Sequence, residues 1–157
     1  MTTIAVRKGL IACDSRVSSD DGISVEIINK VWFSKRHPVA YCVAGTLANA
    51  SAMTHIIDAH TYMPWEKPKL WNTNDRPSMV GSRMLIVCKD GRTFCIEEQG
   101  WYESTGPYHA LGTGAMAALA AMKMGASAKR AVEIAITLDQ YSGAPVHLFK
   151  LEDIGNG

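Results

Sequence analysis

Apolar residues along the chain recur at every second position or in short runs, and both patterns predict β-strands. Val25 and Ile27 alternate with polar neighbours, while the run 39–44 is apolar throughout, as in a buried strand. The Asp90-Gly91 pair between two apolar runs is typical of a hairpin. The predicted strands are 2–6, 10–12, a segment that begins at Ile23 and runs toward Trp32, 39–44, 84–88, 93–97 and 145–151.

Three segments carry helical spacing. An alanine-rich segment from Gly114 to Gly125 predicts one helix, and Ser127 is the expected N-cap of another that runs to about Leu138. In the segment 46–60, several side chains fall near one face of a helix: Leu47, Ala50, Met53, Thr54 and Ile57. The order of elements predicts a layered α/β domain with mainly antiparallel strands.

Residues 62–78 differ from the rest of the chain. They contain three prolines and two tryptophans, which predicts a long loop. A loop of this length in a compact domain is typically functional or part of an interface. Its aromatic content favours an interface, although a loop that two tryptophans pin over the edge of the core fits equally well.

The composition predicts a single globular domain over residues 1–157, long enough to bury a core without a metal or disulfide. Sixteen basic and fifteen acidic residues give a net charge of +1, which leaves no electrostatic footprint for nucleic acid or an anionic membrane. The apolar run 110–122 is too short to span a bilayer, and the N-terminus lacks the apolar segment of a signal peptide. We therefore expect a cytoplasmic protein.

The cysteines and histidines indicate no metal site. The cysteines are Cys13, Cys42, Cys88 and Cys95, each in an apolar stretch and none in a C-x-x-C pair, so we expect small buried hydrophobes. His55 and His60 are five residues apart and therefore do not share a helix face at metal-binding spacing.

Thr2 carries the first candidate chemistry. A small side chain after the initiator methionine generally permits removal of Met1, which would make Thr2 the first residue. Its α-amine, with an ordinary pKa of about 7.7–8.0, and its hydroxyl are on adjacent carbons, so the free amine could accept the hydroxyl proton. Nucleophile and base would be one residue. Many chains begin Met-Thr, so this signal alone is weak.

The opening sequence MTTIAVRKGLIACDSRVS resembles the start of the proteasome β-subunit superfamily, and is most similar to the HslV-type bacterial proteasome-related peptidases. Four further segments match in the same order, so the resemblance spans nearly the whole chain: 29–31, 43–46, 110–114 and 139–143. It implies the fold of N-terminal-nucleophile hydrolases, a four-layer αββα sandwich of two mainly antiparallel sheets. It also implies threonine peptidase activity that needs no metal or cofactor.

The resemblance implies a role for each matching residue. Thr2 is the nucleophile, and the cation of Lys30 keeps the pKa of the α-amine low and stabilises a developing alkoxide. Asp14 orients Lys30. Gly45 supplies a backbone N–H to the oxyanion.

Three more polar residues match the family's support of the α-amine and the lysine. They are Thr113, Asp139 and Ser142. Thr113 replaces the usual serine of a Gly-Ser-Gly motif, and its hydroxyl can still bond to the α-amine.

Simpler interpretations remain for most of these residues. Lys30 could be a surface lysine at the end of a strand, and Asp14 could begin an Asx turn. Gly45 could be the glycine that precedes a helix beginning at Thr46. It could fill this role and still donate its N–H to the oxyanion. Asp139 and Ser142 could provide the chemistry of a helix end and a turn.

The resemblance also implies a specificity pocket for the residue before the cleaved bond. Its lining is apolar or bulky, which predicts a preference for apolar residues: Val17, Ile28, Trp32, Val43 and Leu47. Ser18 matches a position that binds the backbone of an extended substrate.

Two features depart from the family pattern. The segment from Thr2 to Asp14 is four residues shorter, an even number that keeps side-chain parity on both strands and lets Asp14 face the site. The loop 62–78 stands where the family has a second long helix, in the layer that faces ring and partner contacts.

The implied partners are a peptide or unfolded-protein substrate, further copies of the chain in a ring, and an unfoldase ATPase. The sequence also allows two other functions. One is an inactive scaffold subunit of the same fold, and the other is an amide hydrolase that acts on a small molecule.

Overall fold

The computed structural model describes residues 2–18, 25–59, 61–66 and 79–155. Its first part contains β1 (Thr3–Arg7), β2 (Leu10–Cys13), β3 (Arg16–Ser18), β4 (Val25–Ile27), β5 (Val31–Phe33), β6 (Val39–Ala44) and α1 (Leu47–Ala59). Its second part contains β7 (Arg83–Cys88), β8 (Thr93–Glu97), β9 (Gly100–Ser104), β10 (Tyr108–Gly112), α2 (Ala115–Lys123), α3 (Ala128–Leu138), β11 (His147–Lys150) and the 3-10 helix η3 (Leu151–Asp153).

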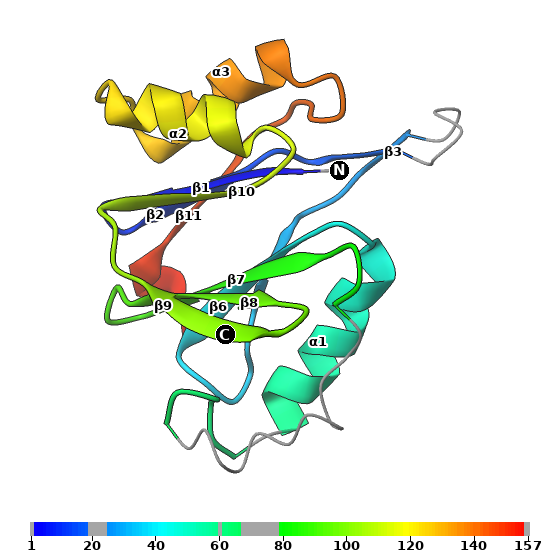
Figure 1. The fold of residues 1–157 in the computed structure, drawn as a ribbon, viewed down its shortest axis with the longest axis vertical. Coiled ribbons are helices and arrows are strands. Elements are labelled where there is room, and N and C mark those ends of the chain that lie inside the picture. The colour runs from blue at the N-terminus through cyan, green and yellow to red at the C-terminus, as the bar shows by residue number, and fades with distance from the viewer. Residues whose placement is uncertain (1, 19–24, 60, 67–78, 156–157) are drawn as a thin grey trace.

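The described strands form two larger sheets and a short ribbon, and their pairs are antiparallel. One sheet has the order β10-β1-β2-β11, and the other has the order β5-β6-β7-β8-β9. The ribbon pairs β3 with β4. The protein is therefore a mixed α/β domain with antiparallel sheets, as predicted (Figure 1).

Apolar side chains fill the space between the two larger sheets. Ile4 and Ile11 of the four-stranded sheet belong to the same buried cluster as Ala40 and Leu85 of the five-stranded sheet. Strand β6 is buried on both faces, since Tyr41 belongs to a different cluster on the opposite side. This double burial explains why 39–44 is apolar throughout.

The helices cover the outer faces of these sheets (Figure 1). Met53 of α1 packs with Tyr41 against the five-stranded sheet. Ala131 of α3 packs with Ala5 and with Met122 of α2 against the four-stranded sheet. The predicted cap of α3 is also present, since the Ser127 hydroxyl accepts the Arg130 N–H at 3.2 Å.

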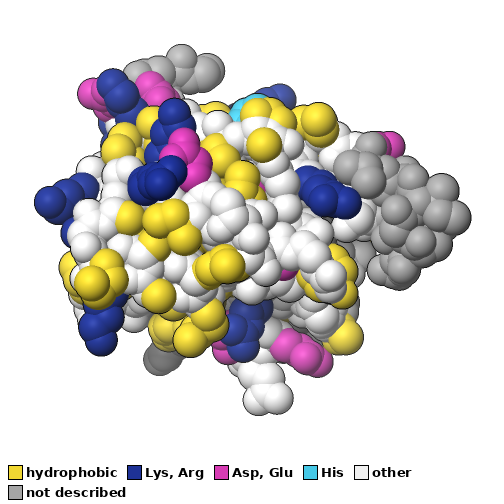
Figure 2. Space-filling view, turned by 90° about the horizontal axis from the view of Figure 1, so that it is seen from above, with side chains coloured by type: hydrophobic (Ala, Val, Ile, Leu, Met, Phe, Trp, Pro, Cys, Tyr) yellow, Lys and Arg dark blue, Asp and Glu magenta, His cyan; other side chains and the backbone are white. Residues whose placement is uncertain are grey.

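Figure 2 looks onto the face that α2 and α3 cover and shows apolar side chains among basic and acidic ones. Met116, Met124 and Leu138 are 78%, 88% and 74% exposed. Apolar side chains thus lie on the outside of the helices as well as beneath them.

The strand prediction was incomplete. The strand expected at the start of the segment 23–32 is present as β4 over its described residues, and the separate strand β5 follows in another sheet. Strand β3 was not predicted. Strands β9 and β10 were not predicted at all, although β10 pairs with β1. In β9, Tyr102 and Glu103 are both exposed, so the strand has no clean alternation of apolar and polar residues.

Most of the predicted loop 62–78 lies outside the described residues, which end at Glu66 and resume at Met79. Trp65 is described, and its ring stacks on Phe94 with centroids 3.8 Å apart. This tryptophan therefore anchors its part of the loop to the core. The second tryptophan, Trp71, lies outside the described residues.

All four cysteines are buried and free, as expected. Burial raises the pKa of the Cys13 thiol to about 11 and that of Cys88 to about 12. Among the described residues, no three metal-ligating side chains gather in one place. No helix of the described chain is long and apolar enough to cross a membrane.

Candidate functional site

The first hairpin brings Asp14 beside the N-terminal segment. Lys8 and Gly9 form its turn with φ of +49° and +76°, the left-handed pair that suits a two-residue hairpin. Asp14 N–H donates to the Thr3 carbonyl at 3.0 Å, and Thr3 N–H donates to Asp14 Oδ1 at 2.8 Å. The shortened hairpin therefore keeps the parity that the sequence predicted.

Asp14 and Lys30 form a buried ion pair. Asp14 is 0% exposed, and Lys30 Nζ lies 2.8 Å from Asp14 Oδ1. Lys30 Nζ also donates to the Arg16 carbonyl at 2.6 Å. Asp14 Oδ2 accepts the backbone N–H groups of Gly143 and Arg16 at 3.0 and 3.3 Å. Lys30 is thus a buried lysine, and the surface interpretation of it was wrong.

Lys30 experiences two opposing effects. Burial lowers the pKa of its ammonium, since desolvation penalises the charged form. The charge and hydrogen bond of Asp14 raise the pKa and offset part of this effect. The net pKa of Lys30 lies below its ordinary value.

A second carboxylate lies at the end of α3. Asp139 Oδ2 accepts the hydroxyls of Thr113 and Ser142, each at 2.6 Å. The Ser142 hydroxyl also lies 2.7 Å from that of Thr3. Burial alone would raise the pKa of Asp139, but hydrogen bonds from Ser142, Thr113 and the Tyr141 N–H outweigh it and hold the pKa below its ordinary value.

In this second network, Asp139 and Ser142 both serve the end of a helix and a turn and take part in the hydrogen bonds around the N-terminal segment. Asp139 caps α3, and the Ser142 N–H donates to the Asp139 carbonyl at 3.2 Å as in a turn. The same two side chains connect Thr113 to Thr3. The Thr113 hydroxyl, which we expected to bond to the α-amine, donates to Asp139.

The two glycines around Thr113 make room for the N-terminal segment. Gly112 pairs with Thr3 across the sheet and has a φ of +97°. A Cβ on Gly112 would overlap the Thr2 carbonyl, and one on Gly114 would overlap the Thr3 hydroxyl. The close approach of the backbones therefore requires glycine on both sides of Thr113.

Gly45 lies between β6 and α1, where two constraints require glycine. Its φ is +115°, and a Cβ there would overlap the Gly81 carbonyl and lie 2.6 Å from Ser82 Oγ. Ser82 is buried, and its hydroxyl accepts Thr46 N–H at 3.0 Å and Asn49 Nδ2 at 2.9 Å. Ser82 thus fixes the backbone that enters the helix, so the helix-entry role of Gly45 is real.

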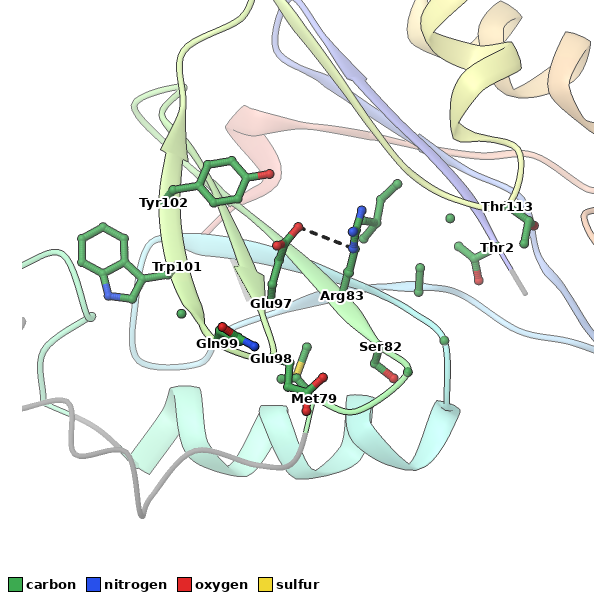
Figure 3. Close-up of a pocket in the computed structure, with 16 residues that line it drawn as sticks. Thr2, Met79, Ser82, Arg83, Glu97, Glu98, Gln99, Trp101, Tyr102 and Thr113 are labelled. Atoms are coloured by element: carbon green, nitrogen blue, oxygen red, sulfur yellow. Dashed lines mark ion pairs between the residues drawn. The ribbon is translucent and has the colours of Figure 1, made fainter.

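A cleft of about 790 Å³ lies beside these residues (Figure 3). Thr2, Gly45 and Thr113 line one part of it. Strand β9 lines another part, with Trp101 and Tyr102. Thr2 itself is 5% exposed, so it touches the cleft with little of its surface.

The predicted specificity residues lie elsewhere in the described structure. Val17, Ser18 and Ile28 are half-buried in or beside the ribbon of β3 and β4. Trp32 stacks on Tyr41 with centroids 6.0 Å apart, and Val43 is buried in the cluster under α1. Leu47 begins α1, but its side chain is outside the described set. The described five do not line the cleft, and the predicted pocket stays a prediction.

Several residues of the site were not predicted. Thr3 contributes both an N–H to Asp14 and a hydroxyl to Ser142, and the doubled threonine at the N-terminus was its only signal. Gly143 and Arg16 act through backbone groups, which any residue type can provide. Ser82 lies far along the sequence from Gly45, and no local pattern connects the two.

No protein family model matches the chain, and no curated protein matches it. Two solved structures of Thiobacillus denitrificans BPH are similar to it, one of them in complex with epoxomicin. Each superposes with a TM-score of 0.67 at 17% sequence identity over 96% of this chain, and over 97% and 98% of the respective other chain. At this identity the likeness shows a shared fold alone.

Proposed function

We propose that this chain is a threonine-type endopeptidase of the proteasome β-subunit superfamily, similar to the HslV-type peptidases and built as their αββα sandwich. The observation that carries the proposal is the setting of the N-terminal segment. Thr2 borders the cleft, and Thr3 bonds to the buried Asp14–Lys30 pair on one side and to Ser142 on the other.

The proposed reaction requires removal of Met1, which frees the α-amine of Thr2. The Thr2 hydroxyl oxygen then attacks the carbonyl carbon of the peptide bond, and its proton passes to the amine directly or through one water. The amine must be neutral to accept that proton. Lys30 and the Thr3 N–H share Asp14 Oδ1, so a cation lies close to this segment and favours the neutral amine.

The bond from Thr2 to the carbonyl carbon forms as the carbonyl oxygen becomes an oxyanion, for which the Gly45 N–H is the proposed donor. Collapse breaks the C–N bond, and the protonated α-amine gives its proton to the leaving nitrogen. Water then attacks the acyl-enzyme ester and loses a proton to the amine. The Thr2 oxygen leaves with that proton, which releases a carboxylic acid.

The epoxomicin complex of the BPH structure supports the same chemistry. Epoxomicin is a peptide epoxyketone, which carries a ketone and an epoxide on adjacent carbons. An N-terminal threonine has a hydroxyl and an amine on adjacent carbons, so each nucleophile can meet one electrophile. We expect an epoxyketone to modify the processed form of this chain.

By resemblance, the proposed peptidase works in the cytoplasm as a homo-oligomeric ring, with peptides or unfolded protein as substrate and an unfoldase ATPase as partner. The exposed Met116, Met124 and Leu138 offer apolar surface to neighbouring molecules.

The mass of the purified, assembled protein tests the proposal first. We expect it to lack Met1 and to gain one equivalent of an epoxyketone probe, whereas Thr2→Ala gains none and loses peptide hydrolysis. If Met1 is retained and the probe does not label the protein, the result would favour an inactive scaffold subunit. Labelling without hydrolysis of any peptide in a broad screen would favour an amide hydrolase that acts on a small molecule.

A further inference from the structure

The cleft extends well beyond the reacting residue. From Thr2 it reaches the turn between β8 and β9 and continues to Trp101 and Tyr102 (Figure 3). Its volume of about 790 Å³ lies within the range of roughly 300–1,000 Å³ typical of sites that hold an entire small ligand. It can therefore hold more than one residue of a peptide.

One wall of the cleft is suited to an extended chain. Strand β9 stands at the edge of the five-stranded sheet as far as the structure describes it. An edge strand offers backbone N–H and C=O groups to an added strand. A peptide in that conformation advances about 3.3–3.6 Å per residue, and both Thr2 and Glu98 of the β8–β9 turn line the cleft, so residues beyond the reacting one would approach this turn.

The charged groups on this wall are predominantly acidic. Glu97 and Glu98 contribute two carboxylates, and Arg83 contributes one guanidinium whose Nε lies 3.4 Å from Glu97 Oε1. Tyr102 is 51% exposed and offers an aromatic face, which attracts cations. This chemistry favours a basic side chain over an acidic one.

The position of the cleft indicates which part of a substrate enters it. Thr2 and Gly45, which would hold the carbonyl under attack, line one part. Val17 and Ser18, which by resemblance contact the residues before the cleaved bond, lie outside it. The cleft is thus left for the residues that follow the bond.

We infer that this cleft binds the leaving segment of the peptide and selects lysine or arginine at the second or third position after the cleaved bond. The inference rests on the proposed peptidase function. It adds a preference on the leaving side to the apolar preference expected before the bond.

Internally quenched peptides test this preference. All share one sequence before the cleaved bond and carry lysine, alanine or glutamate at the second and third positions after it. For the wild type we expect kcat/KM to be roughly three- to tenfold higher with lysine than with glutamate, because the pairs are partly exposed to water. Equal rates, or a preference for glutamate, would overturn the inference.

One double variant and one control assign the preference to this wall. In the double variant Glu97→Gln/Glu98→Gln, Arg83 is left without its carboxylate partner on this wall, so we expect the lysine-to-glutamate ratio to fall to one or below. Glu103→Gln removes an exposed carboxylate of the neighbouring strand β9 that does not line the cleft, and it should keep the wild-type ratio and activity. A ratio that survives in the double variant would place the selection elsewhere and refute the inference.

A second measurement separates the inference from the proposed function. A tripeptide amide with a fluorescent leaving group contacts nothing beyond the cleaved bond, so its hydrolysis reports the peptidase alone. If the wild type cleaves this amide without discriminating among the peptides, the peptidase stands and the inference falls. If the wild type cleaves none of these substrates, fluorescence anisotropy measures the binding of labelled forms of the same peptides to the Thr2→Ala protein. Stronger binding of the lysine peptide still supports the cleft assignment, and equal binding refutes it.

Discussion

Lys30 and Asp14 form a 2.8 Å ion pair from which water is almost wholly excluded, and the carboxylate oxygen that binds Lys30 also accepts the Thr3 N–H. A buried carboxylate with several donors is stable only while each partner stays in place. The pair therefore couples the stability of the fold to the position of the N-terminal segment.

Asp14→Asn should destabilise the protein strongly, because it leaves the Lys30 ammonium buried without its counter-charge. Loss of one partner from a buried pair costs about 3–5 kcal/mol. Lys30→Met should cost less, since the Asp14 carboxylate keeps its N–H donors from Thr3, Gly143 and Arg16. Urea denaturation at pH 7 measures both changes.

Lys129→Met is the control for this comparison, because it breaks an exposed pair with Glu133 at 3.8 Å. Its free energy of unfolding should stay within about 0.5 kcal/mol of the wild type. An Asp14→Asn protein as stable as this control would contradict the importance of the buried pair.

Ser142→Ala should raise the pKa of Asp139, because the Ser142 hydroxyl is one of the groups that hold this pKa low. A carboxyl whose folded-state pKa is lowered contributes stability above its unfolded pKa, about 3.9. That contribution disappears as the pH falls through the folded-state pKa. In Ser142→Ala, the carboxyl should thus take up its proton at a higher pH than in the wild type, as followed by carbon NMR.

Ser104→Ala provides the comparison, since its hydroxyl bonds to His109 and has no part in the Asp139 network. The Asp139 resonance should titrate in this variant as it does in the wild type. If Ser142→Ala also leaves the titration unchanged, the hydrogen bond between Ser142 and Asp139 does not control the carboxyl.

Gly45→Ala should impair both folding and activity. A residue with a side chain at positive φ costs about 1–2 kcal/mol, and here the new Cβ would also meet Gly81 and Ser82. Gly91→Ala imposes the first cost alone, because its φ is +92° and no atom lies within 4 Å of the new Cβ. We expect urea denaturation to show a larger loss for Gly45→Ala, with at least a tenfold lower kcat. Equal losses would show that the approach to Gly81 and Ser82 is unimportant.

The sequence predicted those parts of the site that depend on local pattern. The parity of the first hairpin places Asp14 beside Thr3, and the wholly apolar run 39–44 forms β6. Asp139, Ser142 and Thr113 were chosen by the resemblance and not by a local pattern, and in the structure hydrogen bonds connect their side chains. The hairpin and the buried strand follow from the spacing and polarity of neighbouring residues, which a sequence shows directly.

The sequence did not predict the strands in which buried and exposed residues fail to alternate. In β9, Trp101 packs against the core while Tyr102 and Glu103 are exposed, and β10 places tyrosine, histidine, alanine and leucine in half-buried or buried positions. Neither strand therefore alternates cleanly between apolar and polar residues. Because β9 was missed, the aromatic part of the cleft wall, Trp101 and Tyr102, was missed with it.

Thr3→Val separates the positioning of the N-terminal segment from its chemistry. Valine keeps the shape of the fully buried Thr3 but removes the hydroxyl that lies 2.7 Å from Ser142 Oγ. The N–H bond to Asp14 remains, so the fold should lose only about 1–3 kcal/mol. We expect kcat to fall while KM changes little, because the loss affects the setting of the nucleophile and leaves the cleft intact. Thr3→Ser should restore much of kcat, since it returns the hydroxyl, and a valine variant as fast as the wild type would show that the hydrogen bond to Ser142 does not position Thr2.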